Sequence, residues 1–275
     1  MKFNFLDLIP IIISLIPILI IILFILLIVV CFKNKVRIKL KSFKGKGFRP
    51  KRGPWGTYVY NGHQGKGKTY SIIEYLVDNN GKIQTFSNIT NIRNVDNITY
   101  FTGFKEMLEI KDKLDMMEYF KRDFIIFNGK RLNIDKTKQL VFVYDELFVE
   151  LGRGSKLGQS IIDFLCQMRK RQIICLTTCQ VWSQLPLDWR QLCRYQIDCN
   201  MFPFFKTGFL IKTFKDAEVM KWSNEEQEHI APIVETTITK CRKRISESFD
   251  TRLRISSTIY KNEYDYLEES ATPQE

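Results

Sequence analysis

The sequence predicts an α/β fold, a parallel sheet with helices on both faces, preceded by one N-terminal transmembrane helix. Three observations predict it. Strand-like and helix-like segments alternate along the chain from residue 57 to residue 214. A glycine-rich loop, Gly62-His-Gln-Gly-Lys-Gly-Lys-Thr69, joins the first strand to the first helix. An uncharged apolar run extends from Leu8 to Phe32. The expected units are an anchor (1–32), a basic linker (33–54), a globular domain (55–260) and a polar tail (261–275).

The apolar run predicts a single membrane crossing. It is longer than the about 20 residues that a membrane helix needs, and a membrane helix tolerates Pro10 and Pro17. Ten of the residues 33–52 are Lys or Arg and none is acidic. Basic flanks stay on the cytoplasmic side. We therefore expect a single-pass membrane protein with its N-terminus outside and the globular domain in the cytoplasm, on the host cell membrane if the chain is viral.

The basic tract also explains most of the net charge. The whole chain has 42 basic and 30 acidic residues, a net charge of +12, and without the tract it has 32 and 30, or +2. The globular part is thus nearly neutral, so overall charge does not indicate nucleic acid. The seven cysteines form no C-x-x-C pair and only two histidines exist. This pattern predicts reduced thiols and no structural zinc.

The elements of the globular domain are predicted in order after a boundary at Gly53-Pro54. Continuous apolar runs predict buried parallel strands, spacing of three and four predicts helices, and Asn128-Gly129 between apolar runs predicts a hairpin within an insert at 123–135. The expected strands are 57–60, 82–87, 140–144, 173–178, 195–202 and 208–214, the last two around a Pro203 turn. The expected helices are 70–77, 104–114 and 161–171.

The glycine-rich loop fits G-x-x-x-x-G-K-[ST], the P-loop that holds nucleoside triphosphate phosphates. Its backbone N–H groups and the helix N-terminus favour negative charge. Lys68 is expected to reach the β- and γ-phosphates, and the Thr69 hydroxyl to hold Mg²⁺. The predicted ligands are ATP and Mg²⁺. The predicted nucleotide-binding residues are Gly62, His63, Gln64, Gly65, Lys66, Gly67, Lys68, Thr69 and Tyr70.

A second strand supplies the acidic partner that a P-loop requires. Asp145 and Glu146 follow the buried run 140–144, at the carboxyl end of a strand, where ligands bind in open α/β sheets. Asp145 is expected to orient Mg²⁺ through its water, and Glu146 to accept a proton from the attacking water.

Three further residues are candidates for contacts to the γ-phosphate. Gln180 follows the strand 173–178 and can orient the water or the phosphate, or it simply caps the next helix. Arg190 and Arg194 are candidates for an arginine finger delivered to a neighbouring subunit. Arg169 to Arg171 end a helix, where basic residues complement the helix dipole.

The motif order resembles that of the zonula occludens toxin-like (Zot-like) ATPases of filamentous phages, within the FtsK–HerA group of DNA-translocating and packaging ATPases. The resemblance rests on the P-loop, Ser87 to Ile92, Asp145-Glu146, Arg169 to Arg171, Thr177 to Gln180 and Trp189-Arg190, with Phe249 to Thr251 near the C-terminus. It implies a RecA-like core, a homo-oligomeric ring, and DNA or virion assembly proteins as partners. In this chain the anchor precedes the ATPase domain, whereas Zot-like proteins usually carry it after that domain.

These observations favour a membrane-anchored, ATP-hydrolysing motor for viral (phage) DNA packaging, extrusion or virion assembly. Alternatives are a conjugation-type plasmid DNA transfer ATPase, an ATPase that drives protein assembly at the membrane without touching DNA, and a nucleotide-binding switch with little turnover. The sequence leaves open the transported substrate, DNA strandedness, ring size, direction of movement, and viral or plasmid origin.

Overall fold

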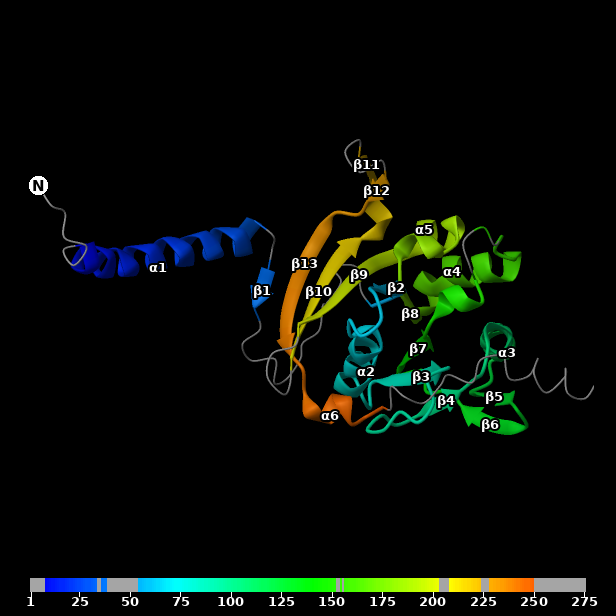
Figure 1. The fold of residues 1–275 in the computed structure, drawn as a ribbon. Coiled ribbons are helices and arrows are strands. Elements are labelled where there is room, and N and C mark those ends of the chain that lie inside the picture. The colour runs from blue at the N-terminus through cyan, green and yellow to red at the C-terminus, as the bar shows by residue number, and fades with distance from the viewer. Residues whose placement is uncertain are drawn as a thin grey trace, which may run out of the picture.

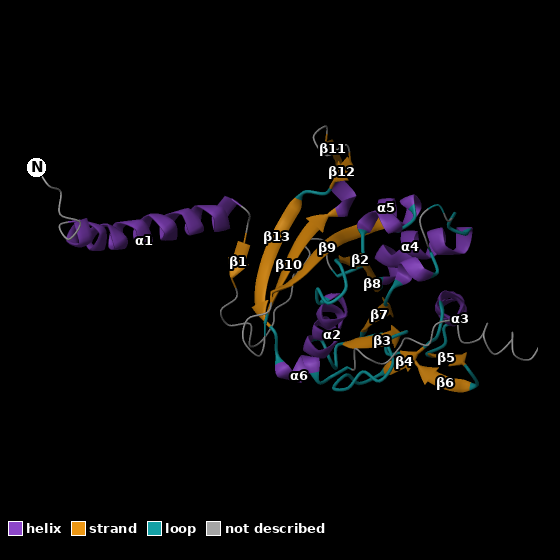
Figure 2. Cartoon of the chain, in the orientation of Figure 1, coloured by secondary structure: helices purple, strands orange, loops and turns teal. Residues whose placement is uncertain are grey.

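The computed structural model describes residues 8–33, 36–38, 54–151, 154, 156–202, 208–223 and 228–249. The predicted polar tail, the Pro203 turn and most of the basic tract lie outside these residues. The central element is a nine-stranded sheet with the order β1-β13-β10-β9-β2-β8-β7-β3-β4. Figure 1 shows this order, and Figure 2 shows helices flanking the sheet.

The sheet has a parallel part and an antiparallel extension. Six neighbouring strands run parallel: β9 (Cys193–Phe202), β2 (Gly56–Asn61), β8 (Ile174–Cys179), β7 (Gln139–Tyr144), β3 (Ile83–Ser87) and β4 (Ile98–Tyr100). β10 (Phe209–Asp216) pairs antiparallel with β9 and with β13 (Ile233–Lys240). The mostly parallel sheet, with β8 between β2 and β7, is consistent with a RecA-like P-loop fold.

Helices cover both faces of the sheet, as predicted. Successive strand residues point to opposite faces, so strands with consecutive apolar residues present apolar side chains on both faces, and the helices bury them. Val59, Phe86, Phe142 and Cys175 belong to one core cluster, together with residues of α3 (Phe104–Tyr119), α4 (Gln159–Arg171) and α5 (Leu187–Leu192). The neighbours of Val59, Phe142 and Cys175 in sequence belong to a second cluster, with residues of α2 (Lys68–Asp78) and α6 (Lys243–Ser246). The central strands thus contribute side chains to two cores, one on each face of the sheet.

The predicted hairpin is confirmed, and two small sheets lie outside the main one. β5 (Phe124–Phe127) pairs antiparallel with β6 (Lys130–Asn133). Asn128 and Gly129 both have positive φ, 49° and 71°, as a two-residue hairpin turn requires. β11 (Lys221–Ser223) pairs with β12 (Glu228–Ile230). Single helical turns of the 3₁₀ type occur at Leu147–Val149, Trp182–Gln184 and Ala217–Val219.

The N-terminal region contains α1 (Leu8–Lys33) and the short strand β1 (Val36–Ile38). The side chains described in α1, those of residues 16–30, are all exposed. Within the described residues, no helix meets the length and apolarity of a membrane span. β1 lies inside the segment predicted as a linker: it pairs parallel with β13 at the edge of the sheet, so this part of the tract is sheet, not linker.

Several elements were not predicted. β4 is only three residues long, and β13 contains Glu235, three threonines and Lys240 instead of an apolar run. α3 continues to Tyr119, beyond the predicted end at Leu114. Strand propensity of such segments depends on the partners that cover them, which a single sequence does not show.

Candidate nucleotide-binding site

The predicted P-loop joins β2 to α2 in the expected strand–loop–helix arrangement. Gly67 precedes α2 with φ 84° and ψ 22°, and a Cβ there would lie 2.8 Å from Leu210 Cδ1. At Gly62, φ is 147° and a Cβ would lie 2.7 Å from the Cys199 carbonyl oxygen. Glycine is required at both positions because a side chain meets strained backbone and a close neighbour.

Lys68 is the first residue of α2 and folds back over the loop. Its Nζ donates hydrogen bonds to the carbonyl oxygens of Gly62, at 2.6 Å, and His63, at 3.1 Å. The side chain is 9% exposed and lines a cavity in front of the loop. The ammonium is therefore held at the place where a phosphate bound to the loop would meet it.

Thr69 and Asp145 come together although they are far apart in sequence. The Thr69 hydroxyl donates to Asp145 Oδ2 at 3.0 Å, and the Thr178 hydroxyl donates to Oδ1 at 2.5 Å. Asn88 fixes the Asp145 backbone, since its side chain accepts from Asp145 N at 2.8 Å and donates to Asp145 O at 3.1 Å. Burial raises the Asp145 pKa, although the two hydroxyl hydrogen bonds act in the opposite direction.

Glu146 leaves the strand in a left-handed conformation, φ 57° and ψ 44°, and its N–H donates to the Thr178 hydroxyl at 2.7 Å. The side chain is half-buried and lines the same cavity as Lys68. Burial and the adjacent Asp145 carboxylate raise the Glu146 pKa, while Lys68 lowers it less. A carboxylate with a raised pKa is a better proton acceptor than an ordinary glutamate.

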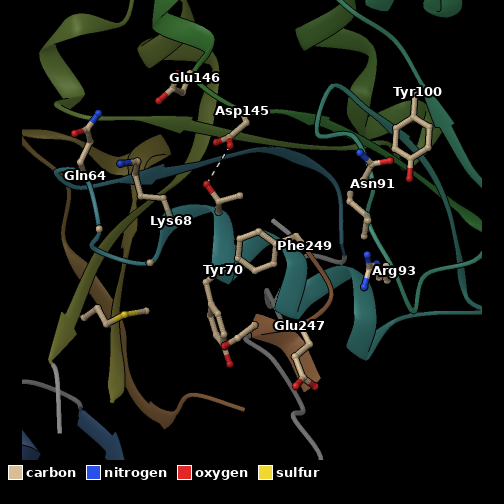
Figure 3. Close-up of a pocket in the computed structure, with 16 residues that line it drawn as sticks. Gln64, Lys68, Tyr70, Asn91, Arg93, Tyr100, Asp145, Glu146, Glu247 and Phe249 are labelled. Carbon is tan, nitrogen blue, oxygen red and sulfur yellow. Dashed lines mark hydrogen bonds between the residues drawn. The ribbon is translucent and has the colours of Figure 1, made fainter. Parts of the chain in front are cut away.

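The cavity has a volume of about 1110 Å³ and extends well beyond the P-loop. Figure 3 shows Gln64, Lys68, Asp145 and Glu146 at one end, and Asn91, Arg93, Tyr100, Glu247 and Phe249 toward the other. The far wall is closed by contacts between distant segments: Arg93 N donates to Ser248 O at 2.7 Å, and Asn94 Nδ2 to Ser248 Oγ at 2.9 Å. Tyr70 lines the cavity, and its hydroxyl accepts from Arg242 N.

The predicted residues divide into two groups. Gln64, Gly65, Gly67, Lys68, Thr69, Tyr70, Asp145 and Glu146 line the cavity. Gly62, His63, Lys66, Gln180, Arg190 and Arg194 do not. Lys66 points instead to Asn200, at 3.0 Å from its Oδ1. Cys179 pairs with Asn61 in the sheet. Gln180 is the next residue, so the backbone of Gln180 lies beside the start of the P-loop.

The prediction of Arg194 as an arginine finger is corrected by the structure. Arg194 is 2% exposed near the start of β9, the end of that strand opposite to the P-loop edge. Its guanidinium donates to Trp55 O at 2.7 Å and lies 3.9 Å from the centre of the Trp55 ring. A side chain enclosed in its own subunit does not reach a neighbour. Arg190, on α5, is half-buried and remains a candidate.

Sequence reasoning missed the supports and the far wall of the site. Asn88 and Thr178 were noted only within resembling motifs, although both hold the Asp145–Glu146 turn. Arg93, Tyr100 and Glu247 carry no local signal, because they belong to loops that meet only in the folded chain. A signal did exist for Phe249, in the resemblance near the C-terminus.

Comparisons with known proteins concern the fold. No family model and no curated protein matches the sequence. Similar solved structures include the N-terminal domain of zonular occludens toxin from Neisseria meningitidis, at 15% identity and a TM-score of 0.42, which covers 71% of this chain and 98% of that chain. They also include the genome packaging NTPase B204 from Sulfolobus turreted icosahedral virus 2 in complex with ATP-gammaS. That match has 13% identity and a TM-score of 0.41, and it covers 66% of this chain and 99% of that chain.

A third similar structure is the KaiC-like protein PH0186 from Pyrococcus horikoshii OT3, at 11% identity and a TM-score of 0.40, covering 71% of this chain and 90% of that chain. The zonular occludens toxin domain is thus among the structures to which this chain is similar. The chemistry of the site follows from the side chains of this chain.

Proposed function

We propose that this chain is an ATPase whose P-loop and acidic turn act together in one cavity. The observation that carries the proposal is the Thr69–Asp145 hydrogen bond of 3.0 Å, which joins the P-loop helix to the acidic strand end. Lys68 and Glu146 line the same cavity. This is the residue set that phosphoryl transfer to water requires: a phosphate cradle, a cation, a metal-binding pair and a base.

Each residue has a distinct task in the proposed reaction. Backbone N–H groups at the start of α2 bind the phosphates, and Lys68 exchanges its two carbonyl contacts for phosphate oxygens. Glu146 removes a proton from the attacking water. The adenine and ribose extend toward Tyr70, Tyr100 and Phe249, which line the same cavity.

The residues present also suit Mg²⁺. The Thr69 hydroxyl and Asp145 carboxylate provide two oxygen groups side by side, and oxygen is the ligand type that Mg²⁺ prefers. Thr69 would bind the ion directly and Asp145 through a water. When bound, Mg²⁺ neutralises charge on the phosphate oxygens.

We further propose that the ATPase is a membrane-anchored motor for viral DNA packaging, extrusion or virion assembly. Support for the anchor comes from the uncharged run from Leu8 to Phe32 and the basic tract after it. On this proposal the N-terminus lies outside and the ATPase domain in the cytoplasm. Support for the motor comes from the motif order, which also implies a ring.

ATPase measurements on the purified full chain test both the proposed ATPase activity and the proposed motor function. Lys68→Ala should abolish turnover, because the charge that stabilises the transition state is removed. Wild-type hydrolysis in this variant would disprove the ATPase. Stimulation by single- or double-stranded DNA supports a DNA motor, and a substantial rate that DNA does not change supports protein assembly at the membrane.

A further inference from the structure

An exposed aromatic and basic surface lies away from the ATP site, at the end of α3 and on the β5–β6 hairpin. Tyr119 is 81% exposed and Phe120 58%, although both are large aromatic residues. Lys113 lies 5.6 Å from the centre of the Phe127 ring, so the helix and the hairpin are in contact. We call this region the α3–hairpin surface; it comprises Tyr119, Phe120, Lys121, Arg122, Ile126, Lys130 and Arg131, all exposed.

The charges of this surface are unbalanced. The acids around it already have cationic partners: Glu118 pairs with Arg171, and Asp123 with Lys136. By contrast, Lys121, Arg122, Lys130 and Arg131 make no ion pair with any carboxylate of the described residues. The surface therefore presents four unneutralised positive charges among exposed rings, and its complement is an anion that also carries flat apolar groups.

The rings and cations are arranged for stacking. The rings of Tyr119 and Phe120 meet edge to face with centroids 5.1 Å apart. The guanidinium of Arg122 lies 5.2 Å from the Phe120 ring centre, and that of Arg131 lies 3.9 Å from the Phe124 ring centre. A planar guanidinium over a ring extends the stacking platform and keeps its charge accessible to phosphate.

A hollow of about 460 Å³ adjoins Tyr119 and adds a further cation. Tyr119 lines it together with Asp115, Glu118, Gln167, Lys170 and Arg171, and Arg171 pairs with both of these carboxylates. Lys170 is exposed and has no carboxylate partner in the described part of the chain. The hollow thus offers a ring, an amide and an ammonium beside the exposed aromatic pair.

Lys121 occupies a backbone position that favours glycine. Its φ is 53°, and the chain ends α3 there with hydrogen bonds from Lys121 N to Glu118 O and from Arg122 N to Met117 O. Helices that end in this way usually carry glycine at the left-handed position. Backbone geometry therefore does not by itself account for a lysine at residue 121.

We propose that the α3–hairpin surface binds single-stranded nucleic acid, with bases stacked on Tyr119 and Phe120 and phosphates held by the surrounding Lys and Arg side chains. Aromatic platforms within a basic groove bind single strands with little sequence preference. This site is separate from the ATP cavity, and the proposal does not rest on ATP hydrolysis.

A membrane is the less suitable partner for this surface. α1 connects to β1 at one edge of the sheet, and β4 forms the other edge. Eight strand spacings of about 4.8 Å separate these edges by roughly 40 Å. In Figure 1 the hairpin lies at the end of the molecule away from α1. A bilayer that contained α1 would therefore lie far from this surface.

The test measures binding of a short fluorescent oligothymidylate to the purified full chain by anisotropy, without ATP. Tyr119→Ala should weaken binding about 5- to 150-fold, the loss expected for one stacked base. Lys121→Gly should lower the slope of log affinity against log salt by about 0.7, since one phosphate contact is lost. Because glycine suits φ 53°, this variant should fold at least as well as wild type, and Lys105→Ala, an exposed lysine at the other end of α3, should leave the slope unchanged.

Four outcomes would overturn the proposal. The first is wild-type affinity and salt slope in both variants, which would place any binding on the basic tract instead. The second is loss of anionic-vesicle binding in Tyr119→Ala without loss of oligonucleotide binding, which would make the surface a membrane contact. The third is a changed oligomeric state in light scattering with unchanged oligonucleotide binding, which would make it a subunit interface. The fourth is equally tight binding of duplex DNA, which would exclude base stacking.

Discussion

Asp145 and Glu146 are neighbours in sequence, yet both reach one cavity. In a continuing strand their side chains would point to opposite faces of the sheet. The left-handed conformation of Glu146 ends the strand and removes that alternation. The conformation is unfavourable for a residue with a Cβ, and the hydrogen bond from Glu146 N to Thr178 holds it. The strained turn thus separates the buried Asp145 carboxylate, proposed to hold Mg²⁺, from the more accessible Glu146, proposed as the base.

Glu146→Gln should retain ATP binding and lower kcat at least about 100-fold, because the amide cannot accept the proton of the attacking water. The pKa of Glu146 is raised, so the base becomes protonated at a higher pH than an ordinary glutamate would. The wild-type rate should therefore already fall, as the pH is lowered, at pH values where an ordinary glutamate is still ionised. A pH profile of kcat measures this. Loss of ATP binding in the variant would instead show that Glu146 has a structural role.

Asp145→Asn should raise the thermal midpoint at neutral pH in the absence of Mg²⁺. Burial raises the pKa of this carboxyl, so its ionised form costs stability above that pKa. The cost disappears as the carboxyl is protonated, so the difference in midpoint should shrink as the pH falls. Thermal unfolding in a chelator across pH measures it, and a lower midpoint for the variant at every pH would contradict the expectation.

At the scale of elements, the P-loop helix is clamped by the end of the described chain. Arg242, between β13 and α6, donates to both Asp78 carboxylate oxygens of α2, at 2.7 and 2.8 Å, and to Glu74 at 3.2 Å. Lys212 of β10 also pairs with Glu74. Burial alone would lower the Arg242 pKa, but Asp78 and Glu74 raise it above its usual value. The antiparallel extension is therefore tied to the helix that binds phosphate.

Arg242→Met should lower the free energy of unfolding by about 1–3 kcal/mol, because Asp78 and Glu74 lose hydrogen bonds to a charged partner. The matched control is Lys243→Ala, which removes an exposed pair with Glu247 and should leave stability unchanged. Denaturant unfolding of both variants measures this. Equal stability of the two variants would show that solvent already satisfies Asp78 and Glu74.

At the scale of the whole molecule, the N-terminal helix and the ATP site are connected to different strands of one sheet. α1 leads into β1, an edge strand, whereas the P-loop strand β2 is central. If α1 anchors the protein as proposed, removing residues 1–32 should release it from membranes and leave at most a salt-sensitive association through the basic tract. Sedimentation with membranes at low and high salt measures this. Resistance of the truncated protein to high-salt extraction would reveal a second membrane contact.

Hydrolysis should also depend on assembly. Arg190 does not line the cavity of its own subunit, so a role for it in hydrolysis would require a neighbouring subunit that receives it. A trans arginine contributes about 10³–10⁵ in rate in related reactions. Arg190→Ala subunits should be nearly inactive alone and regain activity when mixed with Lys68→Ala subunits. ATPase rate against mixing ratio measures this, and no rescue at any ratio would contradict a shared site.

The sequence by itself determined the P-loop, the acidic strand end and the hairpin. Each depends on local chemistry: glycine at positive φ, an apolar run before a carboxylate, and Asn-Gly between strands. These signals lie within a few residues of each other, so no distant contact alters them. They sufficed to place Lys68, Thr69, Asp145 and Glu146 in one site.

Only the tertiary structure decided the far wall of the cavity, the burial of Arg194 and the strands β4 and β13. Asn94 meets Ser248 across 154 residues, and Arg194 is enclosed by Trp55 from 139 residues earlier. Such contacts leave no periodic or local pattern in the chain, because each partner is chosen by packing. The physical reason for the division is range: backbone conformation is encoded locally, whereas burial is a property of the whole fold.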